Sequence, residues 1–253
     1  MALDIARLRA NFPDREILWQ EVTGSTMTDA ALLAAAGCPS GTVVGAEEQI
    51  AGQGRYGRSW YSERGTGLYV SIVLRLPLAA DDVPVLTLAL GLATAEAIAR
   101  ATGLACDLRW PNDVLLDEKK CAGILIQSAG GAFIAGIGVN VNQTAFPADI
   151  AGGATSLRLV SGAEHSREDL LENLLRSTDS FVKMLLEGGR EPVLRVFSRA
   201  SSYTFGKRVV VEQAGAALEG VTDGLTPSGF LLLRQDDGRT SLITAGGVRP
   251  VTP

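Results

Sequence analysis

The chain has 253 residues, a formal net charge of −5 at pH 7, and 46% hydrophobic residues. This length fits one large domain or a main domain with a small appendage, and the composition is ordinary for a globular protein. The acidic balance disfavours a sequence-independent nucleic-acid binder, which needs a basic face. Three dispersed cysteines disfavour a disulfide framework or a zinc knuckle and favour a reducing cytoplasm. A single histidine, His165, disfavours a Ser-His-Asp triad.

The N-terminal part of the chain is predicted to alternate strands and helices. The expected elements are a strand at 15–22, a helix from Ser25 or Thr26 to about residue 36, strands at 42–49 and 67–76, and a helix at 81–102. The longest apolar stretch, 83–99, contains threonines and a glutamate. It is therefore predicted to be a core helix rather than a membrane span.

The rest of the chain is predicted to add three strands, two helices and then a run of short strands. Strands are expected at 105–116, 120–128 and 132–141, with Gly130 and Gly131 as a hairpin turn. The 3–4 residue spacing of leucines predicts an amphipathic core helix at 166–187, and a shorter helix is expected at 192–201. After Tyr203, short strands at 207–212, 217–221, 229–234 and 241–244 predict a small β module. We therefore expect one domain at 1–203 and another at 204–253.

The most informative segment is GQGRYGR at residues 52–58, followed by Trp60. Three glycines let the backbone approach a ligand closely, and Arg55 and Arg58 supply planar cations suited to carboxylate and phosphate oxygens. No Gly-Lys-Ser/Thr follows, so this is not a Walker A loop. Alone, the segment is equally consistent with a solvated turn or a nucleic-acid contact.

Four other segments are weak signals individually. Ser25 and Thr26 stand at a helix start, where N-capping is the simpler interpretation. RWPND occupies 109–113, and GIGVN at 136–140 brings glycines and an amide into a strand. Lys120 precedes an apolar strand, where a gatekeeper charge is the ordinary role. The adjacent Cys121 is interpreted as a small buried core residue rather than a nucleophile.

In this order, the five segments resemble the biotin protein ligase family from about residue 15 to the end of the chain. That family carries Ser-Thr-Asn at a helix start, a Gly-Arg-Gly-Arg-x-Gly-Arg loop, Lys-Trp-Pro-Asn-Asp, a lysine before Ala-Gly-Ile, and Gly-x-Gly-x-Asn. The resemblance implies an α+β fold, with a class II synthetase-like catalytic domain of mixed or antiparallel sheet and helices and a C-terminal SH3-like β-barrel. It also implies that biotin and ATP form biotinyl-5′-AMP, which a lysine of a carrier protein then attacks.

The resemblance assigns roles to individual residues. Fixed positive charge suits the joining of two anions, and Lys120, Arg55 and Arg58 are the implied catalytic cations. The implied biotin-binding residues are Ser25, Thr26, Met27, Gln49, Gly52, Gln53, Gly54, Arg55, Lys120 and Gly123. The implied ATP-binding residues are Arg55, Arg58, Trp60, Asn112, Asp113, Lys120 and Asn140. Mg²⁺ is expected on the triphosphate, and the residues that hold it are not identified.

This sequence departs from the family pattern at three positions. Gln53 stands where the first loop arginine is common, which removes a charge that would help retain the intermediate. Met27 replaces an asparagine, and Arg109 replaces a lysine, which keeps the charge but changes its geometry. None of the three removes the core set of residues.

The expected partner is a biotin carboxyl carrier protein of acetyl-CoA carboxylase or a related carboxylase, in the cytoplasm, with no DNA and no membrane. The motifs begin at about residue 24, which leaves no room before them for a helix-turn-helix reader and favours the enzyme-only form. Whether the protein is a homodimer stays open. Two alternatives are less favoured: a lipoate ligase or octanoyltransferase, whose families lack the arginine loop and Trp-Pro-Asn-Asp, and a biotin-sensing regulator.

Overall fold

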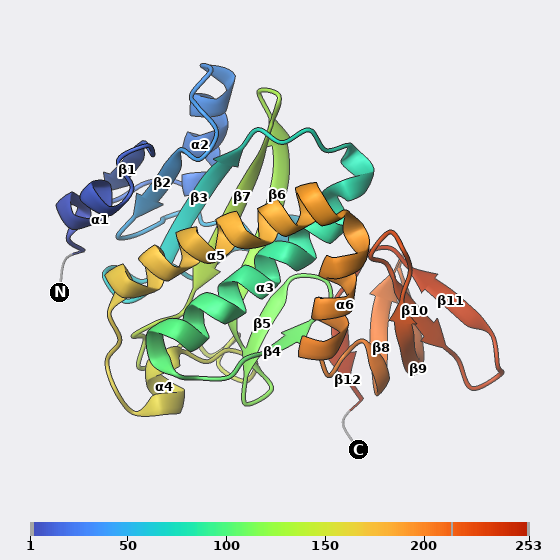
Figure 1. Ribbon diagram of the computed structural model, residues 1–253. Coiled ribbons are helices and arrows are strands. Elements are labelled where there is room, and N and C mark those ends of the chain that lie inside the picture. The colour runs from blue at the N-terminus through green and yellow to red at the C-terminus, as the bar shows by residue number, and fades with distance from the viewer. Residues whose placement is uncertain (1–2, 214, 252–253) are drawn as a thin grey trace.

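A seven-stranded mixed sheet forms the body of the protein in a computed structural model that describes residues 3–213 and 215–251 (Figure 1). Its strand order is β1-β2-β3-β7-β6-β5-β4. Only the β1–β2 pair is parallel, and every other neighbour is antiparallel. The strands are β1 Ile17–Gln20, β2 Val43–Ala46, β3 Leu68–Leu74, β4 Asp107–Arg109, β5 Asp113–Leu116, β6 Lys119–Ala129 and β7 Ala132–Val139.

Helices cover both faces of this sheet. They are α1 Ile5–Asn11, α2 Thr26–Ala35, α3 Val83–Thr102, α4 Leu157–Ser161, α5 Arg167–Gly188 and α6 Arg190–Ala200, with short 3₁₀ turns η1 Arg55–Gly57 and η2 Ala80–Asp82. Helices α3 and α5 lie side by side across one face (Figure 1). Successive side chains of β3 point to opposite faces of the sheet. Val70 and Ile72 therefore belong to the core with α3 and α5, and Val73 belongs to a smaller core with α2.

Helix α3 is the central helix of the larger core. By length and composition alone, Ala80–Thr102 is apolar enough to cross a membrane, but 61% of its most apolar window is buried inside the molecule. Leu86, Leu88, Leu90 and Ile98 are fully buried in this helix, and Gly103 ends it in a left-handed conformation. The position of α3 agrees with the core helix predicted for this stretch.

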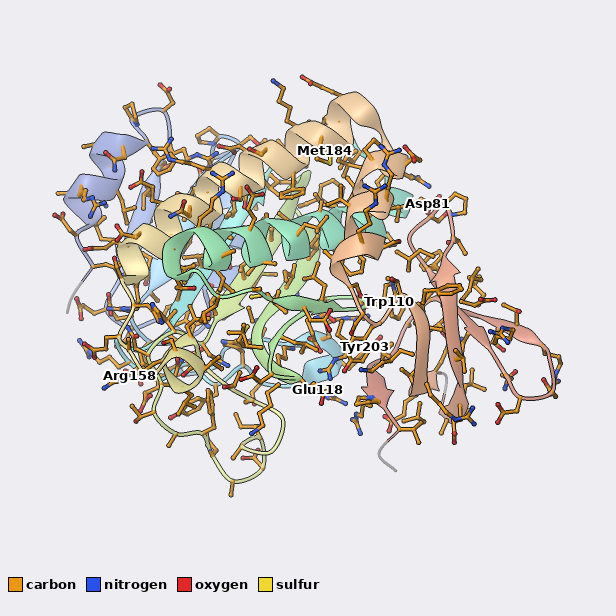
Figure 2. All side chains as sticks on the ribbon, turned by 60° about the horizontal axis from the view of Figure 1, so that its bottom comes forward. Asp81, Trp110, Glu118, Arg158, Met184 and Tyr203 are labelled. Carbon is orange, nitrogen blue, oxygen red and sulfur yellow. The ribbon has the colours of Figure 1, made fainter. Side chains whose placement is uncertain are left out.

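A separate five-stranded antiparallel sheet follows in the C-terminal part of the chain. Its strands are β8 Phe205–Gln213, β9 Ala216–Leu225, β10 Leu231–Arg234, β11 Thr240–Ile243 and β12 Val248–Pro250, in the order β11-β10-β9-β8-β12. Trp110 connects it to the body, because the indole Nε1 donates a hydrogen bond of 2.9 Å to the Gly229 carbonyl. Figure 2 shows Trp110 and Tyr203 where the body meets this sheet. The α+β class predicted from the sequence is confirmed.

The structure differs from several expected elements. The single strand predicted at 105–116 is two strands, because a turn with a cis Trp110–Pro111 bond lies between β4 and β5. The elements α1, α4 and β12 are additional. Both helices are short, and β12 depends on pairing with the distant β8. Leu186, one of the leucines whose spacing predicted the core helix at 166–187, is 41% exposed. The Gly130-Gly131 hairpin is confirmed, with positive φ at both glycines.

Candidate active site

The glycine-arginine segment folds into a closed loop between β2 and β3. Its base is fixed by hydrogen bonds from the Trp60 N–H to the Gly52 carbonyl, 2.8 Å, and from the Gly54 N–H to the Arg58 carbonyl, 2.7 Å. A Cβ at Gly52 would lie 2.6 Å from the Trp60 carbonyl oxygen, so a side chain cannot be accommodated there without movement. Arg55 and Tyr56 lie near the tip of this loop, in the short turn η1.

Buried polar groups gather below the loop, where α2 begins. The Gln49 Oε1 accepts hydrogen bonds from the Thr26 N–H and hydroxyl, at 2.9 and 3.1 Å. The Gln49 Nε2 donates to the Ser62 hydroxyl at 2.9 Å, so both ends of this amide are oriented. The Ser25 hydroxyl is buried without a hydrogen-bond partner among the described residues. Ser25 occupies the N-cap position of α2 but makes no capping bond, which contradicts the simple capping interpretation of its side chain.

Glycines on β6 and β7 form the floor beside this polar group. Gly123 is paired directly with Gly138 across the two strands. A Cβ at Gly138 would lie 2.5 Å from the Trp60 ring, and one at Gly136 would lie 2.4 Å from the Met27 sulfur. The missing side chains therefore leave a trough that the Trp60 indole occupies at Gly138 and Met27 occupies at Gly136. The Trp60 Nε1 is buried without a hydrogen-bond partner among the described residues.

Lys120 lies next to this trough in a small group of charges. Its Nζ is 2.5 Å from Asp113 Oδ1 and 5.3 Å from the centre of the Trp60 ring. The other carboxylate oxygen of Asp113 accepts from Arg109 Nη2 at 2.8 Å. Burial alone raises the pKa of Asp113, but the charges of Lys120 and Arg109 outweigh it and hold this pKa below its usual value. Asp113 is therefore ionised and holds the ammonium of Lys120 in place.

The adjacent cysteine is not part of this charge group. Cys121 is fully buried, and its Sγ contacts the Val114 carbonyl oxygen at 3.4 Å. Burial raises the pKa of the thiol well above its usual value, so it stays protonated. The structure agrees with a core role for Cys121.

Two cavities meet at the loop. The first, about 50 Å³, lies over the polar group and the glycine floor, and the second, about 490 Å³, extends from the loop toward the C-terminal sheet. Five residues line both: Gly54, Arg55, Trp60, Asn112 and Lys120. Among the described residues Arg55 has no ion-pair partner, and its Nη1 donates instead to Asn112 Oδ1 at 2.9 Å. Two cations therefore stand where the cavities join.

The structure brings together nearly all the residues expected at the site. The first cavity is also lined by Thr26, Met27, Gln49, Gln53 and Gly123, and the second by Arg58, Asp113 and Asn140. Ser25 and Gly52 line neither cavity. The side chain of Asn140 donates to the Thr155 carbonyl at 3.0 Å and thereby fixes the segment after β7.

Sequence reasoning missed several residues that line the second cavity. They are Tyr56, Ser59, Tyr61, Phe146, Asp149, Ile150, Gly153, Ala154, Gly246, Gly247 and Arg249. Three of these come from the C-terminal sheet and its loops, and Arg249 is a single arginine on a short strand. No local motif marks it, since its position depends on the pairing of β12 with β8.

Comparison with known proteins identifies the class to which this fold and site belong. Residues 19–143 match the sequence model of the biotin/lipoate A/B protein ligase family, and residues 204–248 match that of the biotin protein ligase C-terminal domain. The chain belongs to this family of protein ligases.

Individual relatives narrow the assignment. The chain is 35% identical over 236 residues to the biotin–[acetyl-CoA-carboxylase] ligase of Mycobacterium tuberculosis, covering 89% of this chain and 85% of that protein. It is 30% identical over 245 residues to the bifunctional ligase/repressor BirA of Bacillus spizizenii, covering 94% and 75%. The biotin protein ligase from Aquifex aeolicus in complex with biotin and ATP superposes with a TM-score of 0.83 at 30% identity, covering 92% and 97%. Within the family, the protein is a biotin protein ligase.

Proposed function

We propose that the protein joins biotin and ATP to form biotinyl-5′-AMP at the junction of its two cavities. One observation carries this proposal: Lys120 and Arg55 line both cavities. A carboxylate in one cavity and a phosphate in the other would meet between these two cations. Adenylation needs this arrangement, because the carboxylate must approach the α-phosphorus, which is itself surrounded by anionic oxygens.

The first cavity offers biotin a polar end and an apolar body. Gln49, Thr26 and the unpartnered Ser25 hydroxyl supply donors and acceptors suited to a ureido ring. The glycine floor and Met27 would then contact the thiophane ring and the aliphatic chain. At about 50 Å³ the cavity is too small for such a ligand, so binding requires the loop or the Trp60 ring to move.

The second cavity suits a nucleoside triphosphate. Arg58 from the loop, Arg249 from the C-terminal sheet and Asn140 all line it. We assign Arg55, Arg58 and Arg249 to the anionic oxygens, because guanidinium forks match phosphate geometry. Trp60 supplies an unpartnered N–H at the boundary of the two cavities.

The chemistry of the donors decides how Mg²⁺ would be held. Among the described residues no group of three or more His, Cys, Asp or Glu could hold a metal ion, and both oxygens of Asp113 are occupied by cations. Asp149 is the other carboxylate that lines the second cavity. The site therefore fits a Mg²⁺ ion that would be held mainly by triphosphate oxygens and water, with Asp149 as the lining carboxylate that could join them. Bound there, the ion would neutralise charge on the leaving pyrophosphate.

The reaction then proceeds in two displacements. A biotin carboxylate oxygen attacks the α-phosphorus of ATP, and the bond from that phosphorus to the bridging oxygen breaks to release pyrophosphate. Lys120 and Arg55 stabilise the negative charge that accumulates in the transition state, while the loop covers the mixed anhydride and excludes water. In the second displacement the amine of a carrier-protein lysine attacks the biotinyl carbonyl carbon, and AMP leaves.

We assign the whole reaction to a cytoplasmic enzyme made of two units. Within the described residues, the mixed sheet and all six α-helices precede Tyr203, and the second sheet begins at Phe205, which supports a division after residue 203. The partner we propose is the biotin carboxyl carrier protein of an acetyl-CoA carboxylase or a related enzyme, as the name of the Mycobacterium tuberculosis relative suggests.

Pyrophosphate release tests the proposed substrates. Purified protein with ATP and biotin should release pyrophosphate, whereas ATP with lipoate should give only the background rate. A higher rate with lipoate would favour the other branch of the family and refute the biotin assignment. Mass spectrometry of the carrier protein, before and after incubation, then checks the transfer of one biotin to a lysine.

A further inference from the structure

The hydroxyl of Tyr56 receives hydrogen bonds from two groups that are far apart in the chain. Arg55 Nη2 donates to it at 2.9 Å, and the backbone N–H of Gly246 donates to it at 2.6 Å. Tyr56 adopts a left-handed conformation, with φ of 58°, which is uncommon for a residue other than glycine. The Arg55 guanidinium lies over the Tyr56 ring, 4.9 Å from its centre.

The second donor comes from a rigid position in the C-terminal sheet. Gly246 precedes β12 and has φ of 114°, and a Cβ at this position would lie 2.3 Å from the Glu212 carbonyl oxygen. Only glycine fits there, so its N–H is presented in a fixed direction. The contact therefore connects the tip of the arginine loop to the β8–β12 edge of the second sheet.

The first donor belongs to a cation whose orientation matters. Arg55 uses Nη1 for Asn112 and Nη2 for Tyr56, so the two ends of its guanidinium are held from opposite sides. Lys120 and Arg109, in contrast, are both paired with Asp113. Arg55 thus keeps a charge without an ion-pair partner among the described residues, held in place by two neutral oxygens. Because both of these oxygens are neutral, the charge of Arg55 stays available to an anionic ligand.

We propose that Tyr56 is a positioning residue that fixes the Arg55 guanidinium and anchors it, through Gly246, to the C-terminal sheet. This inference rests on the proposed function, because Arg55 acts there on the α-phosphate. The C-terminal sheet then contributes to the first displacement without touching the reacting atoms: it holds the Tyr56 oxygen, which holds the guanidinium. The nucleotide cavity is bounded by this same contact, since Tyr56 and Gly246 both line it.

The variant Tyr56→Phe tests the proposal, because it keeps the ring under Arg55 and removes only the hydroxyl. We expect kcat/KM for ATP in biotin-dependent pyrophosphate release to fall roughly ten- to 100-fold, the effect of one hydrogen bond to a charged group. In an Arg55→Gln background the same change should cause no further loss, since Tyr56 acts through Arg55. The matched control is Tyr203→Phe, whose buried hydroxyl has no partner among the described residues and which should react at the wild-type rate.

Hydrogen exchange supplies a readout that does not depend on activity. The peptide containing Gly246 should exchange faster in Tyr56→Phe than in wild type, while peptides from α3 and β3 stay unchanged. A Tyr56→Phe enzyme with wild-type kcat/KM, losses that simply add to those of Arg55→Gln, or unchanged exchange at Gly246 would each overturn the proposal. These results differ from failure of the proposed function, in which the wild-type enzyme itself releases no pyrophosphate with biotin.

Discussion

Replacing Lys120 by alanine should nearly abolish adenylation while leaving the fold intact. Lys120 is one of two cations that line both cavities, and its ammonium is held by Asp113 at 2.5 Å. Loss of one preorganised group at a centre of developing charge typically costs about 2.7–4 kcal/mol, which corresponds to a rate decrease of about 100- to 1000-fold. Asp113 keeps its second partner, Arg109, so the carboxylate is not left unpaired.

The cost in stability should be much smaller than the cost in activity. The Lys120 side chain is 29% exposed, and partly exposed ion pairs contribute about 1 kcal/mol or less. Pyrophosphate release in a single turnover with biotin and ATP measures the activity, and chemical denaturation measures the free energy of unfolding. Lys119→Ala is the matched control, because Lys119 is the neighbouring lysine, is exposed, and has no ion-pair partner among the described residues. A Lys120→Ala enzyme that forms biotinyl-5′-AMP at the wild-type rate would refute the role assigned to this residue.

Three further substitutions probe the loop, the charge group and the floor. Gln53 donates to the Thr28 hydroxyl at 3.1 Å. The substitution Gln53→Arg adds a cation over the intermediate and should therefore slow the release of biotinyl-5′-AMP, measured by filter binding. An unaltered release rate would contradict this. Asp113→Asn should lower the free energy of unfolding at pH 7. Since the folded-state pKa of Asp113 lies below the value of about 3.9 in an unfolded chain, the difference from wild type should stay constant from pH 7 to about pH 5 and shrink progressively at lower pH; shrinkage already above pH 5 would be inconsistent. Gly138→Ala should displace the Trp60 ring, cost about 1–3 kcal/mol in stability and change the tryptophan fluorescence. A Cβ at Gly152 would meet open space, so the control Gly152→Ala should change neither stability nor fluorescence.

The sequence predicts most of this site because its residues lie in short motifs with local physical meaning. The glycine spacing at 52–58 requires a backbone that approaches other groups closely, and Gly52 indeed has no room for a Cβ. Lys120 before an apolar strand suggested a gatekeeper charge, and the structure places it beside a half-buried carboxylate. The family resemblance supplied the roles of these residues, which neither composition nor periodicity contains.

Local patterns did not reveal contacts made by the fold as a whole. The hydrogen bond from the Gly246 N–H to the Tyr56 hydroxyl joins residues 190 positions apart, and no pattern in either segment indicates it. The expected strand at 105–116 failed for a related reason. Its residues favour extended backbone individually, but Asp113 pairs back onto Arg109, so the chain must turn between them. Ser25 was correctly placed at a helix start, but only the packed structure shows that its hydroxyl is left without a partner.

The direct pairing of β3 with β7 has a consequence for how the enzyme acquires activity. Leu68 lies opposite Val139 in this register, so strands about 70 residues apart must meet before the arginine loop and the glycine floor lie together. Contacts of such long sequence separation form slowly, because the intervening chain must first be ordered. The site is assembled from two separate segments: residues 25–62 supply the polar group and the loop, and residues 120–138 supply Lys120 and the glycine floor. A ribosome-bound chain that ends before β7 therefore contains the arginine loop but lacks the β7 glycines of the floor.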